Sequence, residues 1–146
     1  LSICVVGGTG AQGSGLALRW AKAGHTVSVA SRDEAKAKAA AQELNAILGS
    51  DRISGTDYAT GAAGASVIVL AIPFASQLST VTALKEQLSG KILIDVTVPL
   101  VPPKVSTVQL PETDSCVVNI QKLLGADVRV VSAFQNVSAH KLKRLE

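Results

Sequence analysis

The sequence predicts an α/β domain in which a doubly wound parallel sheet is covered by helices on both faces, giving three layers. Short runs that are β-branched and almost continuously apolar alternate with longer segments rich in Ala, Leu, Lys, Glu and Gln, and this alternation with short links is typical of that class. Runs that are apolar on every residue fit strands buried on both faces, as in a parallel sheet. The chain has 146 residues, 47% of them apolar, which is the size and composition of one folded domain.

Three strand–helix pairs are predicted in the first half of the chain: 2–7 with 11–23, 26–31 with 32–48, and 52–56 with 58–63. The strand segments carry β-branched residues, and the helical segments are rich in residues of high helix propensity. Gly24 and Gly49 follow the two longer helical segments, in the position where glycine commonly ends a helix. The third pair combines a weaker strand with a short Ala/Gly-rich helix.

Two further pairs and a last strand are predicted in the second half: 66–72 with 75–88, 91–98 with 115–124, and 128–134 alone. Gly90 and Gly125 follow the two helical segments as further helix stops. The stretch 99–111 (PLVPPKVSTVQLP) is rich in proline and cannot form a central strand or a helix interior. We therefore expect a loop after the strand 91–98, and long loops at strand ends often carry function.

The first predicted strand leads directly into a glycine-rich loop that opens the first helix. Gly8, Gly10 and Gly13 of this loop form the pattern G-x-G-x-x-G. Inside a strand–helix–strand unit the pattern predicts a Rossmann-like dinucleotide-binding domain: Gly8 permits the tight turn, Gly10 lets the backbone approach a pyrophosphate, and Gly13 packs the helix on the sheet. The N–H groups at the start of the helix would then hold the phosphates. The alternative is a turn that only joins strand to helix.

The end of the second predicted strand indicates which dinucleotide is bound. An NAD-selective domain needs Asp or Glu there to accept the ribose hydroxyls, but this strand ends in Ser31 and Arg32. Both side chains can donate hydrogen bonds to a 2′-phosphate, so we expect NADP. Ser31 has an alternative role, because Ser31 and Glu34 have the spacing of a capping box at a helix start.

Charges in the next predicted helix support an anion site. Glu34 and Lys38 have the i,i+4 spacing of a stabilising pair, whereas Arg32 and Lys36 have the same spacing with like charges. An anion held between Arg32 and Lys36 would relieve that repulsion. Asp33 is the one acid near enough to accept ribose hydroxyls, but we expect it to serve the helix dipole instead.

Together with further motifs, these residues resemble the NADPH-dependent coenzyme F420 reductase family, the deazaflavin-linked NADP oxidoreductases. The resemblance covers essentially the whole chain and rests on Gly7-Gly8-Thr9-Gly10 with Gly13, GLALR at 15–19, GH at 24–25, Ser31-Arg32 with Lys36, AIP at 71–73 and VPLVP at 98–102. It implies an NADP-dependent oxidoreductase that transfers a hydride between NADP(H) and coenzyme F420 or a similar small-molecule acceptor. The chain departs from the family pattern at Phe74, Ser76 and Gln135, where members often carry Trp or His.

The resemblance also implies roles for individual residues. The pyrophosphate would be held by Thr9, Gly10, Ala11 and Gln12, and the 2′-phosphate by Ser31, Arg32 and Lys36. Ile72, Val98 and Ala139 would flank the nicotinamide. Pro73 is a further cofactor-binding candidate, with a rigid strand-to-helix joint as its alternative role. The predicted sheet agrees on the place, because ligands bind outside the carboxyl ends of parallel strands.

No catalytic acid or base and no metal site is predicted, and hydride transfer between two ring systems depends mainly on their positioning. We expect Asp95, inside an apolar strand, to be a hydrogen-bonded structural carboxylate, with a place in the cofactor cleft as the alternative. His25 is expected to be structural, and His140 lies in a polar tail. Cys4 and Cys116 lie in apolar stretches, as small buried thiols of a reducing compartment do.

The composition limits the classes of partner that this chain is expected to bind. The net charge is +3, and the one basic cluster, Lys141, Lys143 and Arg144, is expected to be solvated. Only 3% of the residues are aromatic, which argues against binding of single-stranded nucleic acid. The longest apolar stretch, 65–75, is too short to span a bilayer. We therefore expect a cytoplasmic protein that binds neither nucleic acid nor membrane.

For the domain organisation, we expect residues 1–137 to form the NADP-binding domain. Residues 138–146 would begin a linker toward a C-terminal helical segment that this chain lacks, and the full-length protein would be a homodimer. The chain alone would then bind NADPH but catalyse poorly. Two alternatives stay open: the NADP-binding domain of a β-hydroxyacid or imine dehydrogenase or a metal reductase, and a non-catalytic NADP redox sensor.

Overall fold

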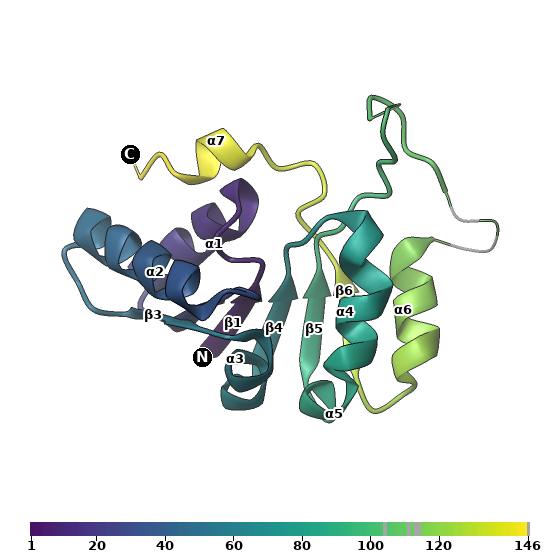
Figure 1. Cartoon of the computed structure of the whole chain (residues 1–146), viewed down its shortest axis with the longest axis horizontal. Helices are drawn as coiled ribbons and strands as arrows, with labels where there is room; N and C mark the ends of the chain where they lie inside the picture. Colours follow the sequence, from purple (N-terminus) through teal and green to yellow (C-terminus); the bar gives the residue numbers. More distant parts are fainter. Residues whose placement is uncertain (104, 111, 113–114, 146) are drawn as a thin grey trace.

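The computed structural model describes residues 1–103, 105–110, 112 and 115–145, which form a six-stranded parallel sheet with the order β3-β2-β1-β4-β5-β6 (Figure 1). The strands are β1 (Ser2–Val6), β2 (Thr26–Ala30), β3 (Ile53–Thr56), β4 (Val67–Leu70), β5 (Ile92–Asp95) and β6 (Arg129–Ser132). The order reverses between β1 and β4, as it does in a doubly wound sheet. The predicted fold class is therefore confirmed.

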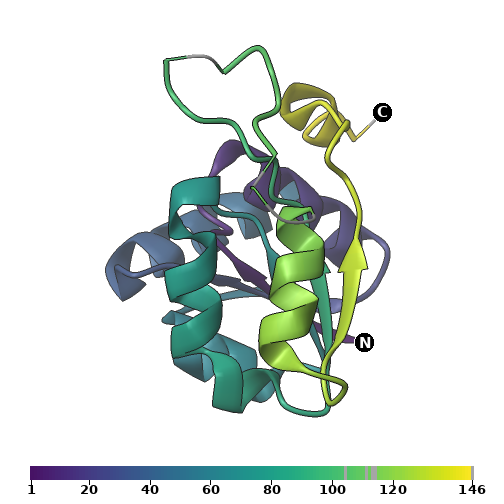
Figure 2. The same ribbon diagram turned by 90° about the vertical axis from the view of Figure 1, so that its right-hand side faces the viewer.

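The helices cover both faces of the sheet (Figures 1 and 2). One layer holds α1 (Ala11–Lys22), α2 (Glu34–Leu48) and α7 (Ala139–Leu142), and the other holds α3 (Tyr58–Gly64), α4 (Gln77–Ala83), α5 (Lys85–Leu88) and α6 (Cys116–Leu124). Residues of β1 alternate between the two cores: Ile3 and Val5 pack with the first layer, Cys4 and Val6 with the second. Both faces of the strand are thus buried, as its continuously apolar sequence predicted.

Every predicted strand and helix is present, but several boundaries differ. The predicted helix 75–88 is divided into a 3₁₀ turn, η1 (Phe74–Ser76), followed by α4 and α5. Leu84 separates α4 from α5 with φ −97° and ψ 5°, outside the α-helical region. The predicted strands 66–72 and 91–98 are shorter than expected, because their pairing ends at Leu70 and Asp95.

The proline-rich stretch contains no helix and no ladder strand among its described residues, which confirms a loop there; Lys104 and Pro111 lie outside the described residues. The loop projects beyond the carboxyl ends of the strands (Figure 2). Among the described residues there is also no helix long and apolar enough to cross a bilayer.

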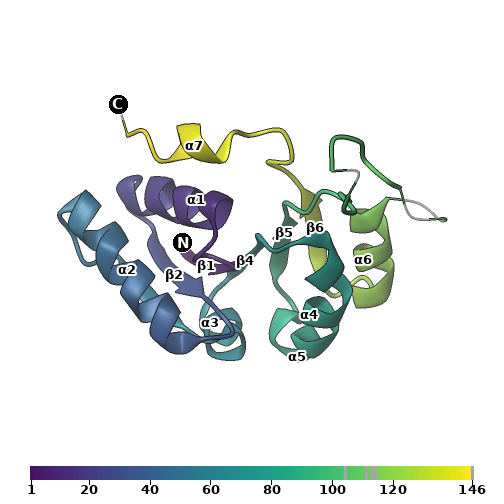
Figure 3. The same cartoon turned by 45° about the horizontal axis from the view of Figure 1, so that its top comes forward.

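The segment after β6 crosses the carboxyl edge of the sheet and lies on α1 (Figure 3). Leu142 is buried against Gly15, where a Cβ atom would lie 2.6 Å from that of Leu142. Arg19 of α1 donates from Nε to the Leu142 carbonyl at 2.9 Å, and also to the carbonyls of Lys141 and Arg144. The side chains of the predicted basic cluster are exposed, as expected, but its backbone is held by α1.

The N-terminus of α1 lies close to the loop that precedes it. A Cβ atom on Gly13 would lie 2.6 Å from the Gly7 carbonyl oxygen and 3.0 Å from Gly8 Cα. Both are backbone atoms, which cannot move aside as a flexible side chain can. Gly13 thus permits the close packing of helix on strand that the loop pattern predicted.

We expect Gly13→Ala to lower the free energy of unfolding by about 1–3 kcal/mol, the usual cost of overpacking. Gly64→Ala is the matched control, because a Cβ atom on Gly64, the last residue of α3, meets no atom of the described residues within 4 Å. Urea denaturation of both variants measures the difference. Equal stability of the two would contradict the close packing at Gly13.

Candidate functional site

The carboxyl ends of β1, β2 and β4 meet at the candidate site. The turn after β1 is made by Gly7, whose φ of 80° lies in the region that favours glycine. The tight turn predicted for Gly8 therefore falls one residue earlier. Gly8 is needed for a different reason: its Cβ atom would lie 2.7 Å from that of Val29 in β2. The loop is thus pressed between β2 and the helix it opens.

Helix α1 presents an open N-terminus at this edge. Gly10 is its N-cap and supplies no side-chain cap, and the first turn contains no acidic residue. The first N–H groups of a helix have no partner within the helix. Thr9, Gly10 and Ala11 are exposed at this end of the helix, which attracts anions. The Gly10 N–H itself donates to the Gly7 carbonyl at 3.0 Å.

Helix α2 begins two residues later than predicted, because Asp33 caps it. The Asp33 carboxylate accepts a hydrogen bond from Lys36 N at 3.2 Å, and Ser31 Oγ accepts one from Asp33 N at 3.1 Å. The predicted capping box of Ser31 and Glu34 is therefore wrong, whereas service of Asp33 to the helix start is confirmed. Arg32 precedes the helix, so it forms no i,i+4 pair with Lys36 within it.

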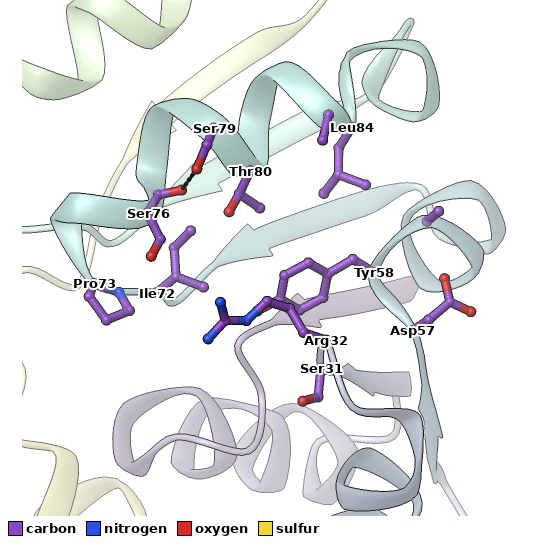
Figure 4. A pocket seen from close by; sticks show the side chains of 12 residues that line it. Ser31, Arg32, Asp57, Tyr58, Ile72, Pro73, Ser76, Ser79, Thr80 and Leu84 are labelled. Carbon is purple, nitrogen blue, oxygen red and sulfur yellow. Dashed lines mark hydrogen bonds between the residues drawn. The ribbon is translucent and has the colours of Figure 1, made fainter.

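Two adjoining cavities open beside Arg32. The first, the phosphate cavity, has a volume of about 590 Å³ and is lined by Gly7, Thr9, Gly10, Ser31, Arg32, Asp33, Lys36, Tyr58, Ala71, Ile72 and Pro73. The second, the α4 cavity, has a volume of about 530 Å³ and is lined by Ser31, Arg32, Asp57, Tyr58, Ala59, Ile72, Pro73, Ser76, Ser79, Thr80, Ala83 and Leu84 (Figure 4). Five residues line both, so the two cavities form one continuous groove.

The charges around the groove favour an anion. Arg32 reaches across its middle beside the ring of Tyr58 (Figure 4), and Lys36 lines the phosphate cavity together with Arg32. Both acids at the groove are helix caps: Asp33 caps α2, and Asp57 caps α3 by accepting a hydrogen bond from Thr60 N at 3.0 Å. Hydrogen bonds from Thr60 lower the pKa of Asp57. Both carboxylates are thus engaged with backbone, whereas the two cations face the groove.

The sequence did not predict that Tyr58 and residues of α4 line the groove. Burial raises the pKa of Tyr58, although the Arg32 charge opposes that rise. Tyr58 follows the cap of α3 and reaches the groove only because α3 packs beside β1 and β2. No local sequence pattern predicts that Tyr58 lines a cavity. The one available indication was that it is the single tyrosine of the chain.

The structure brings seven of the predicted site residues into the phosphate cavity: Thr9, Gly10, Ser31, Arg32, Lys36, Ile72 and Pro73. Gly8 and Gly13 are buried, and Ala11 is exposed. Gln12 is turned away from the groove: its Nε2 donates to the Phe134 carbonyl at 2.8 Å. Val98 follows β5 and Ala139 begins α7; both are half-buried and line neither cavity.

The remaining candidates are structural. Asp95 is fully buried and accepts two hydrogen bonds, which confirms the expected structural carboxylate. Cys4 and Cys116 are free buried thiols, as predicted. Burial raises the pKa of Cys4 to about 11 and also raises that of Cys116. Neither thiol is therefore suited to nucleophilic chemistry at neutral pH.

Comparison with known proteins agrees with this geometry. A family described as NADP oxidoreductase, coenzyme F420-dependent, matches residues 2–99. The chain belongs to this family. It is 40% identical to the F420-dependent NADP reductase of Methanothermobacter thermautotrophicus over 97% of its own length and 64% of that protein. The corresponding reductase of Methanocaldococcus jannaschii is 37% identical over 100% of this chain and 68% of that protein. The chain thus spans about two thirds of the length of these curated relatives.

Comparison with solved structures also finds proteins similar to this chain. A protein of Arthrobacter sp. FB24, provisionally assigned as an F420-dependent NADP-reductase, superposes with a TM-score of 0.77 at 32% identity, covering 94% of this chain and 64% of that one. The imine reductase BcSIRED of Bacillus cereus superposes with a TM-score of 0.66 at 20% identity, covering 95% of this chain and 42% of that one. The second likeness shows a shared fold alone.

We expect Asp33→Ala to lower the free energy of unfolding by about 1 kcal/mol, because α2 loses its N-cap. Asp33→Ser removes the charge but keeps a capping oxygen, so this control should recover most of the loss. Chemical denaturation monitored by circular dichroism measures both. A fully stable alanine variant would mean that the Asp33 cap does not hold α2.

Proposed function

We propose that this chain is the NADP(H)-binding part of an F420-dependent NADP reductase, and that the whole protein transfers a hydride between NADP(H) and coenzyme F420. One observation carries the choice of cofactor: Arg32 and Lys36 face a cavity that the glycine loop also lines, while Asp33 is occupied as a helix cap. Family membership supports the choice of acceptor.

The glycine loop fits a pyrophosphate. Among the described residues, a Cβ atom built on Gly10 would contact the Gly7 carbonyl at 3.3 Å and nothing else within 4 Å, so the side facing the groove is open to a ligand. Thr9 and Ala11 would offer backbone donors at the start of α1, where the helix dipole favours negative charge. Gly10, whose N–H donates to the Gly7 carbonyl, would instead let the backbone approach the pyrophosphate. Gln12 would take part through its backbone N–H, since its side-chain amide is bound to Phe134.

The neighbouring cations fit the 2′-phosphate. Arg32 and Lys36 would donate charge-assisted hydrogen bonds, and Ser31 a neutral one. At about 1.5–3 kcal/mol each, two charge-assisted bonds would favour NADP over NAD by roughly 10²–10⁴. The α4 cavity continues from Arg32 and contains apolar Ala83 and Leu84, which suit the flat face of the adenine base.

The other end of the cofactor would lie between Ile72 with Pro73 and Val98, with Ala139 close by. When bound, the nicotinamide supplies the hydride, and the chain's residues hold its ring, exclude water and present one face to the acceptor. Such a step needs orientation and no protein acid or base. The apolar character of these four residues agrees with that requirement.

The remaining parts of the proposal concern the whole protein. The curated relatives are longer than this chain. We therefore propose that residues 1–137 are the cofactor domain, that 138–146 lead toward a further helical segment bordering the acceptor, and that the protein is a homodimer in the cytoplasm. Glu146 lies outside the described residues. The chain alone would bind NADPH and catalyse slowly.

Arg32→Ala should reduce the preference for NADPH over NADH by about 10- to 100-fold, the loss of one charge-assisted interaction of about 1.5–3 kcal/mol. Lys38→Ala removes the same charge one turn along α2, where Lys38 pairs with Glu34 at 2.7 Å, so this control should retain the preference. Titration of each variant with both nucleotides, followed by fluorescence, gives the ratio. Unchanged preference in Arg32→Ala would reject the 2′-phosphate site.

Adding oxidised F420 to the full-length protein should cause rapid NADPH consumption, followed by absorbance. Imines, β-hydroxyacids, ferric complexes and flavins tested in parallel distinguish the alternative reductases. Turnover with one of these and none with F420 would reassign the acceptor. NADPH binding without turnover of any acceptor would support a redox sensor.

A further inference from the structure

A buried polar cluster lies just beneath the proposed nicotinamide end, where the pairing of β4 with β5 ends. Leu70 and Asp95 form the last pair of the β4–β5 ladder. Beyond this pair the chain after β4 continues through Ile72 and Pro73, and the chain after β5 continues to Val98. Val96 N donates to the Leu70 carbonyl at 3.2 Å just past this pair. Further along, no ladder pairing among the described residues joins the two segments.

The Asp95 side chain bridges these two segments. Its Oδ1 accepts a hydrogen bond from Thr97 N at 2.9 Å, next to Val98 in sequence. Its Oδ2 accepts one from Gln77 Nε2 at 2.6 Å, and Gln77 is the first residue of α4, joined to Pro73 by the single turn η1. One carboxylate thus connects both segments.

Both side chains of this bridge are inaccessible: Asp95 is 0% exposed and Gln77 is 3% exposed. Neither can touch a ligand in the groove. Burying a carboxyl group is costly unless it is well hydrogen-bonded, and an apolar pair could fill the same space. Both partners of Asp95 are donors, so the position of each carboxyl oxygen is set by one of the two segments.

Other contacts anchor the cluster to the rest of the sheet edge. Gln135 Nε2, after β6, donates to the Asp95 carbonyl at 2.9 Å. Cys116, the first residue of α6, places its Sγ 3.9 Å from the Thr97 carbonyl oxygen. The segments following β4, β5 and β6 and the start of α6 therefore converge on Asp95.

We infer that Asp95 and Gln77 are positioning residues that set the gap between the Ile72–Pro73 segment and Val98, and thereby the placement of the nicotinamide ring. The inference rests on the proposed function. Displacing a reacting ring by about 1 Å can slow a reaction by about 10²-fold.

The residues proposed to hold the 2′-phosphate, Ser31, Arg32 and Lys36, lie at the end of β2 and the start of α2. The proposed adenine wall shares α4 with Gln77, but it is made at the other end of that helix, by Ala83 and Leu84. The contacts made by 2′,5′-ADP are therefore not those of the bridge.

The test uses the full-length protein and compares Gln77→Leu with an exchanged pair. Gln77→Leu removes the link to Asp95 while filling its space. Gln77→Glu alone sets two carboxyl groups against each other, and the double variant Asp95→Asn/Gln77→Glu restores one donor and one acceptor in reversed order. For each protein, the affinities for 2′,5′-ADP and NADPH, the emission of bound NADPH, and single-turnover hydride transfer to F420 are measured.

We expect Gln77→Leu to bind 2′,5′-ADP as the wild type does, to shift the emission of bound NADPH, and to transfer hydride about 10²-fold more slowly. The exchanged pair should recover the wild-type emission and rate, and Gln77→Glu alone should not. If Gln77→Leu fails to fold, this recovery decides the question. Wild-type emission and rate in Gln77→Leu, an equal loss of 2′,5′-ADP binding, or no recovery in the pair would each overturn the inference. A wild-type protein that does not bind 2′,5′-ADP would instead overturn the proposed function.

Discussion

The candidate site depends on one steric constraint, the close approach of the β1–α1 loop to its surroundings. Gly8 lies against Val29 of β2, and Gly13 lies against the backbone of the loop, at distances that leave no room for a Cβ atom. These contacts bring the N-terminus of α1 to the same edge as the end of β2. The open helix donors and the Arg32 side chain therefore border a common cavity, although one belongs to the first strand–helix unit and the other to the second.

The charge that a ligand meets at this edge is positive, because the acidic side chains there accept hydrogen bonds from backbone N–H groups. A carboxylate at a helix N-cap satisfies an otherwise unpaired N–H group and interacts favourably with the helix dipole. Asp33 and Asp57 both do this. A ligand in the groove therefore meets two cations and a helix N-terminus, which is why a doubly charged phosphate fits better than a ribose with free hydroxyls.

Much of the fold could be predicted, because each strand of a parallel sheet is marked by its own apolar run and each helix by its own composition. Boundaries were less predictable where two residues compete for one role. Ser31 and Asp33 both precede α2, and the carboxylate of Asp33 takes the cap. The phosphate cavity could be predicted, since Arg32 follows the end of β2 and Lys36 lies in the first turn of the next helix. The α4 cavity could not, because Tyr58 and Leu84 meet Arg32 only through packing of α3, α4 and α5.

Gln12 lies within the glycine-rich motif, as the sequence indicated, but its side chain has a structural role that the sequence did not indicate. Its side-chain amide holds the carbonyl of Phe134, a bulky residue with φ of 67°, a conformation that costs of order 1–3 kcal/mol and persists only where surrounding contacts enforce it. The Phe134 ring packs edge-to-face on Trp20, which lies in α1 as Gln12 does, with ring centroids 5.9 Å apart. Helix α1 therefore fixes the bend by which the chain leaves β6, and through Arg19 it fixes the return of that chain as α7. Ala139 begins α7, so the helix that would bind the pyrophosphate also positions the residue proposed to border the nicotinamide. One rigid element would therefore position both the pyrophosphate and the nicotinamide.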